Sequence, residues 1–367
     1  MNVSLVDLNN QHARILEEMH RALGEVLESG AFILGPRVRD LEEKIAETCG
    51  ARFGVGCASG SDALLLALMA LGVECGDEVI TTPFTFFATA SAITRIGARP
   101  VFVDIDPETF NLDASKIREA MTERTRAILP VHLFGMPADM DAINALAKDA
   151  GIAVLEDAAQ ALGSSYRGRP VGSLGHAASI SFYPTKNLGA IGDAGMMVTS
   201  DEEVANRMRQ LRVHGETERY YHGVVGLNSR LDEVQAAALL IKLRLMDAWN
   251  ARRRENAAIL TEGLRGTSVT LPKEVDDCET IVHHYVVRAP RRDELRAFLG
   301  ERGIATGVYY PVSLHMQPCF AFLGYQEGSL PVSERACEEV LALPVIPEVT
   351  GEQLESVITA IREFYGE

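Results

Sequence analysis

A single lysine, Lys186, follows a short apolar segment and is itself followed by a run of glycines. The stretch from residue 179 to residue 189 is expected to be a short strand that runs into a loop presenting Lys186, and Gly189, Gly192 and Gly195 lie beyond the lysine. Glycines remove the steric limit that a Cβ atom sets, so a bulky ligand can approach the backbone here. Such a lysine is either a solvated surface charge or a nucleophile toward carbonyl groups, and local composition alone favours the surface charge.

Two other short stretches carry groups that bind polar ligands. Ser59, Gly60 and Ser61 begin an expected helix, whose free N–H groups and dipole favour an anion such as phosphate. The same residues also suit an ordinary helix cap, and a cap alone is the more frequent case. Asp157 ends an apolar segment, with Gln160 just after it. A carboxylate there either holds a protonated ring nitrogen or caps the next helix.

Aromatic residues supply the last of these groups. Phe84, Phe86 and Phe87 lie close together, and an aromatic face can stack on a flat ring, although core packing is the simpler role for two of the three. A lysine nucleophile, a strand-end aspartate, an aromatic ring and a phosphate-binding helix start are, together, the groups that an enzyme using pyridoxal 5'-phosphate (PLP) requires.

Strands and helices alternate through the first half of the chain. Continuous apolar strands separated by amphipathic helices predict a largely parallel sheet that is covered on both faces. Ligands gather at the carboxyl ends of such strands, and Ser59, Asp157 and Lys186 each follow an expected strand end. The expected strands are residues 53–57, 78–81, 100–104, 127–131, 153–157 and 196–199, and the helices between them are 63–71, 87–96, 115–121 and 138–149.

The pattern changes near residue 250. The sequence predicts a large ligand-binding domain over residues 1–249, which begins with a helix at 11–29, and a small α+β domain over 250–367. The basic run Arg252-Arg253-Arg254 is most simply a solvated helix face. Other expected elements are a helix at 202–211, a long helix at 232–249, strands at 285–287 and 307–310, and helices at 293–300, 333–341 and 352–364.

Composition excludes several classes of function. The net charge of −16 argues against a general nucleic-acid-binding surface. The six cysteines are dispersed without a C-x-x-C pair, and no H-x-x-x-H pair is present, which predicts free thiols and no metal site. No apolar run is long enough to span a membrane, and the N-terminus lacks a signal-peptide pattern. We therefore expect a cytoplasmic protein.

Over nearly its whole length the sequence resembles the DegT-type nucleotide-sugar aminotransferases, which are PLP enzymes of the aspartate aminotransferase (type I) fold. This resemblance implies an α/β fold with a mixed, mostly parallel seven-stranded sheet between helices, and a smaller α+β C-terminal domain. Each matching motif is loose alone, but their order and spacing are specific. The motifs are residues 59–64, 82–86, 130–135, 156–160, 181–186, 226–232 and 310–315.

The resemblance also implies a role for each candidate residue. Lys186 carries PLP as a Schiff base and then moves a proton, and Asp157 pairs with the pyridinium nitrogen. Asn228 reaches the cofactor phosphate of the neighbouring subunit, so the working unit is a homodimer, and Arg230 beside it meets the donor carboxylate or the nucleotide. The other implied contacts are Gln160 with the ring hydroxyl, Phe86 with the ring face, Gly60, Ser61 and Ser181 with the phosphate, and Tyr310 and His315 with the sugar nucleotide.

The implied reaction moves an amino group from L-glutamate, which becomes 2-oxoglutarate, to a keto sugar linked to a nucleoside diphosphate. The product is an amino sugar for surface polysaccharide or for a glycosylated metabolite. Residues 219–222 resemble the branches that aminate a 3-keto sugar rather than a 4-keto sugar. One alternative is a PLP- or PMP-dependent dehydratase of the same fold, in which histidine replaces the lysine. The other is a non-enzymatic regulator that binds the cofactor or a sugar nucleotide. Lys186 argues against the first alternative, and the presence of Asp157, Gln160 and Lys186 argues against the second.

Overall fold

A seven-stranded sheet forms the centre of the structure, a computed structural model that describes residues 2–367. Its strands are β1 (Phe53–Cys57), β2 (Glu78–Thr81), β3 (Arg99–Phe102), β4 (Thr125–Leu129), β5 (Ala153–Asp157), β8 (Ala177–Ser181) and β9 (Gly195–Thr199). They are arranged in the order β1-β9-β8-β5-β4-β2-β3. β9 runs antiparallel to β1 and β8, and the remaining pairs are parallel. The predicted mixed, mostly parallel sheet is confirmed.

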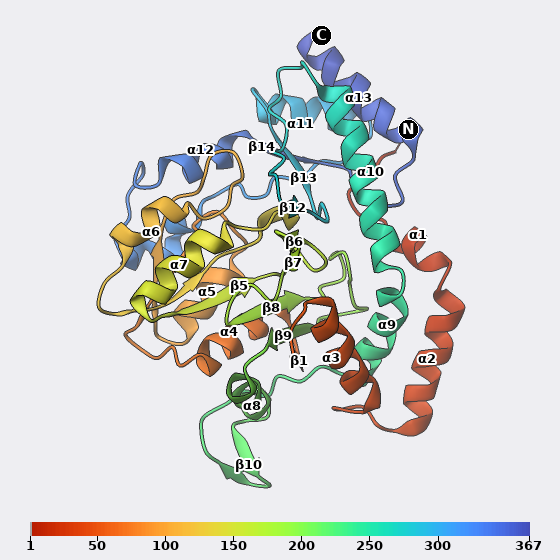
Figure 1. Cartoon of the computed structure of the whole chain (residues 1–367). Coiled ribbons are helices and arrows are strands. Elements are labelled where there is room, and N and C mark those ends of the chain that lie inside the picture. The colour runs from red at the N-terminus through yellow and green to blue at the C-terminus, as the bar shows by residue number, and fades with distance from the viewer. Residues whose placement is uncertain (1) are drawn as a thin grey trace.

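Helices cover both faces of this sheet (Figure 1). Because side chains alternate along a strand, Ile128 of β4 packs into one core and Leu129 into the other. The first core is covered by α3 (Pro36–Thr48), α6 (Ala114–Ala120), α7 (Met140–Ala150) and α9 (Glu233–Leu243). The second is covered by α4 (Gly60–Ala70), α5 (Ala88–Arg95) and α8 (Glu202–Leu211).

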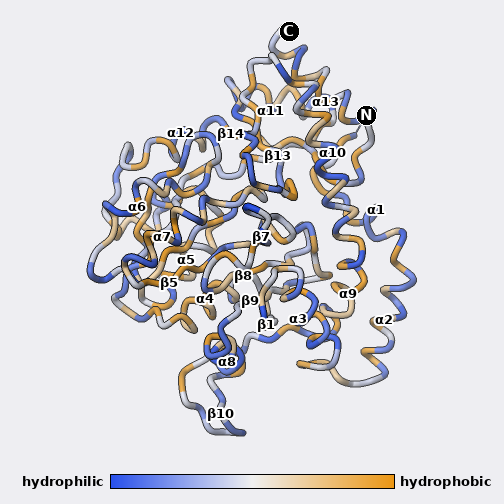
Figure 2. Tube along the Cα trace, viewed as in Figure 1, coloured by the Kyte–Doolittle hydropathy of each residue, from blue (hydrophilic) through white to orange (hydrophobic). Residues whose placement is uncertain are grey.

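The helices α4 and α8 show how the distribution of apolar residues along a helix determines how deeply the helix is buried in this fold. α4 is apolar all round, with Leu64 to Leu68 buried, so it lies in the interior against the sheet. α8 carries one narrow apolar face and is mostly blue in Figure 2, which marks hydrophilic residues. It therefore lies outside α4. In the part of the chain that is described, no helix is both long enough and apolar enough to span a membrane.

The C-terminal part contains a second, smaller sheet. The strands β13 (Tyr285–Arg288) and β14 (Val340–Leu343) pair antiparallel and share a core with α10 (Met246–Leu264), α11 (Arg292–Glu301) and α13 (Gly351–Tyr365). The predicted strand at 307–310 is wrong, because only Gly307 bridges to the sheet, through Ala342. The predicted helix at 333–341 ends at Glu339 as α12 (Pro331–Glu339), and the apolar run after it forms β14.

Two long helices predicted from the sequence are each broken. The predicted helix at 11–29 is α1 (Leu8–Ala13) followed by α2 (Leu16–Ser29), and that at 232–249 divides into α9 and α10. Neither break contains glycine or proline, so neither has a local signal. The second break separates two packing environments, since α9 packs on the large sheet and Leu260 of α10 lies in the C-terminal core. α10 runs across the predicted boundary after residue 249, and the division into 1–249 and 250–367 stays a prediction.

β5 ends in two buried carboxylates, Glu156 and Asp157. Glu156 points away from the site described below and accepts backbone N–H groups from Leu174 at 2.8 Å, Gly175 at 2.7 Å and Gly172 at 2.9 Å. Its Oε2 also lies 3.0 Å from Nε2 of His132. The Nδ1 atom of His132 accepts the N–H of Ala138, which places the ring proton on Nε2, so His132 donates to Glu156.

We expect the change Glu156→Gln to lower the free energy of unfolding by roughly 3 to 5 kcal/mol, because an amide cannot accept all four of these bonds in a buried site. Chemical denaturation of the cofactor-free protein measures this loss. The matched control is Glu119→Gln, at an exposed position on α6. An equal effect of the two changes would contradict the assigned role of Glu156.

Candidate active site

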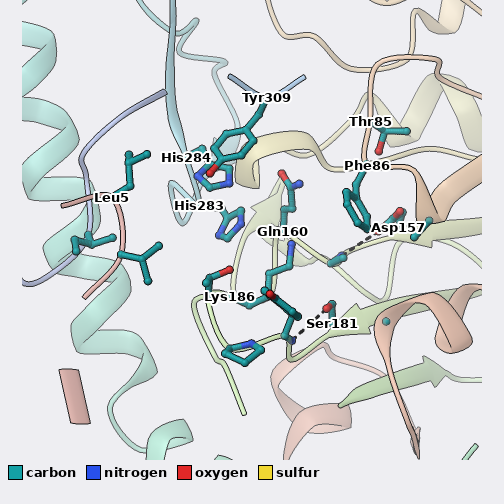
Figure 3. A pocket seen from close by; sticks show the side chains of 18 of the residues that line it. Leu5, Thr85, Phe86, Asp157, Gln160, Ser181, Lys186, His283, His284 and Tyr309 are labelled. Atoms are coloured by element: carbon teal, nitrogen blue, oxygen red, sulfur yellow. Dashed lines mark hydrogen bonds between the residues drawn. The ribbon is translucent and has the colours of Figure 1, made fainter. Parts of the chain in front are cut away.

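A cavity of about 640 Å³ lies at the carboxyl ends of the central strands. The large sheet and the C-terminal part both contribute walls, and Leu5 from the N-terminal segment lines another side (Figure 3). Eight of the residues predicted from the sequence line it: Gly60, Ser61, Phe86, Asp157, Gln160, Ser181, Lys186 and Tyr310.

Lys186 lies on the loop that follows β8. This loop folds back tightly, with the N–H of Lys186 donating to the carbonyl oxygen of Tyr183 at 2.8 Å and that of Ala190 donating to Phe182 at 2.8 Å. A Cβ atom at Gly189 would lie 2.2 Å from the carbonyl oxygen of Pro184, so the loop requires glycine there. Burial lowers the pKa of the Lys186 amine to about 8, against an opposing effect of the Asp157 charge.

Asp157 is 5 % exposed at the end of β5. Its Oδ2 accepts the hydroxyl of Thr89 at 2.8 Å, and its Oδ1 accepts the N–H of Ala159 at 3.2 Å. Burial raises the pKa of this carboxyl, and the two hydrogen bonds and the Lys186 charge oppose the rise. A cation in the cavity beside it, such as a protonated ring nitrogen, would stabilise its ionised form.

Gln160 and Phe86 line the cavity near Asp157 (Figure 3). Gln160 has a fixed amide orientation, since Oε1 accepts the N–H of Phe134 at 2.8 Å and Nε2 donates to the hydroxyl of Tyr310 at 3.0 Å. Phe86 is 58 % exposed and Phe87 is 43 % exposed, whereas Phe84 is fully buried, so the prediction that two of the three rings lie in the core holds for Phe84 alone. A flat aromatic ligand therefore has an exposed ring available for stacking.

The first turn of α4 forms another wall of the cavity. Ser59 caps the helix by accepting the N–H of Asp62 at 3.1 Å, and Gly60 and Ser61 follow at the cavity. A Cβ atom at Gly60 would lie 2.5 Å from Cβ of Ser181. The helix start therefore packs closely against the end of β8 at the cavity, and the free backbone N–H groups of a helix N-terminus suit an anion bound there.

Three predicted residues are absent from the lining of the cavity within residues 2–367. Asn228 is exposed and Arg230 is partly buried. Between them, Ser229 donates to Asp62 at 2.8 Å, which fixes this segment beside the start of α4. His315 is buried, with Nδ1 2.9 Å from the hydroxyl of Ser313 and Nε2 2.9 Å from Glu334. The roles expected for these three residues stay predictions.

Several residues of the cavity had no signal in the sequence. His283 and His284 were only adjacent in the chain, yet both line the cavity. Nδ1 of His283 lies 2.8 Å from Oδ1 of Asn187, the residue after Lys186. His284 stacks on Tyr309 at 4.3 Å between ring centroids. Burial lowers the pKa of each histidine well below 6.5, so both rings are neutral at neutral pH.

These residues fit PLP. The cavity combines a partly neutral lysine, a buried carboxylate that lacks an ion pair within the described chain, an exposed aromatic ring and a helix N-terminus, which match the aldehyde, ring nitrogen, ring face and phosphate of that cofactor. Among the described residues, no group of three or more His, Cys, Asp or Glu side chains is placed to hold a metal ion.

Comparison with known proteins agrees with this fit. The profile of the DegT/DnrJ/EryC1/StrS aminotransferase family matches residues 13–362, and the chain belongs to this family. It is 55 % identical to a pleiotropic regulatory protein of Geobacillus stearothermophilus, over 100 % of this chain and 99 % of that one. It is 45 % identical to the dTDP-3-amino-3,4,6-trideoxy-alpha-D-glucose transaminase of Streptomyces venezuelae, over 99 % of this chain and 96 % of that one.

A solved structure has the same fold throughout. The crystal structure of S. venezuelae DesV in complex with a ketimine intermediate superposes with a TM-score of 0.97, at 44 % identity, and covers 100 % of this chain and 99 % of that one. The predicted type I fold is confirmed, and the protein is a PLP-dependent aminotransferase by family.

The lowered pKa of Lys186 predicts how the cofactor-free protein reacts with added PLP. Only the neutral amine attacks an aldehyde, so the rate should rise with pH and level off above about 8, the pKa of Lys186, rather than above its ordinary 10.5. Because the Asp157 charge raises this pKa, the change Asp157→Asn should move the midpoint below 8.

Stopped-flow absorbance at a series of pH values measures this midpoint. Lys186→Ala is the control and should show no saturating signal. A wild-type midpoint near 10.5 would mean that burial does not depress the pKa of Lys186.

Proposed function

We propose that this protein transfers an amino group from L-glutamate to C3 of a keto sugar carried on a nucleoside diphosphate. The observation that carries the proposal is the convergence of Lys186 and Asp157 on one cavity at the strand ends. When bound, PLP supplies an electron sink for charge that develops on the substrate carbon. Asp157 keeps the ring nitrogen protonated, and Lys186, as a neutral amine, takes a proton from one carbon and returns it to another.

Two findings support this class of acceptor. The Streptomyces venezuelae relative is named for a dTDP-3-amino sugar. Residues 219–222, which precede Asn228 and Arg230, resemble the branches that act at C3 rather than at C4. The amino sugar product would serve surface polysaccharide or a glycosylated metabolite.

A regulatory role is the second candidate, because the Geobacillus stearothermophilus relative is named a pleiotropic regulatory protein. The residues of the cavity, however, favour a catalytic role over one of ligand binding alone. A protein that only bound a ligand would not need a lysine whose pKa is lowered beside a buried aspartate, and both groups are in place here. Lys186 likewise argues against a dehydratase that carries histidine at this position.

The proposed working unit is a homodimer in the cytoplasm that shares each active site between two subunits. A hairpin of β10 (Glu216–Glu218) and β11 (Tyr221–His222) projects from the body of the chain (Figure 1). Tyr220 and Tyr221 on it are 76 % and 70 % exposed, and Val225, three residues after it, is 90 % exposed. These exposed apolar groups support contact with a second copy, which would bring Asn228 toward that copy's cavity. The six free cysteines support a reducing compartment.

A reverse assay tests the reaction. Purified protein incubated with 2-oxoglutarate and a panel of 3-amino and 4-amino nucleotide sugars should release L-glutamate with the 3-amino sugars. Lys186→Ala should lower this rate by at least about 100-fold, because the proton transfer loses its base. Activity confined to 4-amino sugars would refute the position assigned, and an absence of activity across the panel would favour the regulatory role.

Mixed dimers test whether the site is shared. Lys186→Ala and Asn228→Ala chains are each expected to be impaired alone. In mixed dimers one of the two sites combines an intact Lys186 with an intact Asn228, so a random equimolar mixture should recover about a quarter of the wild-type rate. Recovery no higher than the mean of the two variants would mean that Asn228 does not act on the partner's site, and it would contradict the shared active site.

A further inference from the structure

The arginine run on α10 is not a uniformly solvated helix face, as the sequence predicted. Arg252 pairs with Glu255 at 3.0 Å and Arg254 with Glu279 at 3.5 Å, and both side chains are about 40 % exposed. Arg253, between them, is only 4 % exposed and lines the cavity that contains Lys186.

The guanidinium of Arg253 is only partly satisfied. Nη1 donates to the carbonyl oxygens of His283 at 3.2 Å and Val282 at 3.4 Å, whereas Nε is buried with no hydrogen-bond partner. Within residues 2–367 this side chain forms no ion pair, although Glu348 lines the same cavity. Burial lowers the pKa of Arg253 to about 10, and the nearby charge of Glu348 opposes this effect. A buried cation with free N–H groups is stabilised by an anion that reaches it.

An amino-acid donor would bring a carboxylate into the cavity, and this carboxylate needs a cationic side chain to bind it. Among the described residues of its lining, Lys186 and Arg253 are the side chains that carry positive charge, because His283 and His284 are neutral. Lys186 is required for chemistry. Figure 3 places His283 and His284 on one side of Lys186, with Asp157 and Phe86 on the other, and Arg253 binds the backbone on the histidine side.

We propose that Arg253 binds a carboxylate of the amino-acid donor, an inference that rests on the proposed function. A planar guanidinium matches a carboxylate in two parallel hydrogen bonds, and an amino-acid donor always brings a carboxylate to the site. The residue suggested for this role by the sequence resemblance, Arg230, does not line the cavity of its own chain. Glu348 lines the same cavity and its charge acts on Arg253, so it would repel an incoming anion and limit its affinity.

Binding of maleate, a dicarboxylate with no amino group, to the PLP-loaded protein tests the assignment by calorimetry. Arg253→Met should weaken binding by roughly 10- to 100-fold, as expected for charged hydrogen bonds. Arg253→Lys keeps the charge without the planar guanidinium, so its affinity for maleate should lie between those of the wild type and Arg253→Met. Arg254→Met, on the exposed face one residue away, is the matched control and should bind like the wild type.

Glu348→Gln provides a test that leaves every arginine in place, and it should tighten maleate binding by roughly 2- to 5-fold because it removes a like charge. In the full reaction, Arg253→Met should raise the KM for L-glutamate and leave the KM for the nucleotide sugar unchanged. A merely structural role would raise both values, and a role in holding an acidic sugar would raise the second alone.

Either of those results would overturn the proposal, as would wild-type maleate affinity in Arg253→Met or an absence of maleate binding to the wild-type protein. Failure of the proposed function is distinguishable from these outcomes. In that case no nucleotide sugar accepts the amino group, yet maleate binding still depends on Arg253.

Discussion

The burial of two adjacent carboxylates at the end of β5 is the constraint on which the site depends. Consecutive strand residues face opposite sides, so Glu156 and Asp157 cannot share partners. Glu156 is satisfied entirely by the protein, through three backbone N–H groups and His132. Asp157 has two hydrogen bonds and a raised pKa. The first carboxylate fixes the strand end, and the second is left to be completed by a cation from the cavity.

The same low-dielectric surroundings set the state of Lys186. Burial disfavours its ammonium form, while the Asp157 charge favours it, and the balance leaves the pKa at about 8. A lysine with this pKa holds about a tenth of its population as the neutral amine at pH 7, far more than a surface lysine does. Thus Asp157, proposed to bind the cofactor, and Lys186, proposed to react with it, have pKa values that are shifted by one shared buried environment.

The sequence predicted the central sheet well because its strands are continuous apolar runs with helices of clear period between them. It also located Lys186, Asp157, Gln160 and Phe86, whose motifs follow strand ends. It failed where tertiary packing decides. The break between α9 and α10 contains no glycine or proline. Arg253 lies between two other arginines, and nothing in the sequence distinguishes it from these solvated neighbours. Glu156 had no assigned role because its partners, residues 132 and 172–175, have no local pattern that marks them.

One turn of α10 connects the reactive loop to the C-terminal part. Asn250 and Arg253 are three residues apart and lie on the same helix face. Oδ1 of Asn250 accepts from Asn187, the residue after Lys186, at 2.7 Å, and Arg253 donates to the carbonyl oxygen of His283 at 3.2 Å. Asn187 in turn contacts the ring of His283. These hydrogen bonds form a ring that joins α10, His283 and the loop of Lys186. A carboxylate bound to Arg253 would therefore be connected to that loop through the ring. Its position and that of the nucleophile are set by the same helix turn.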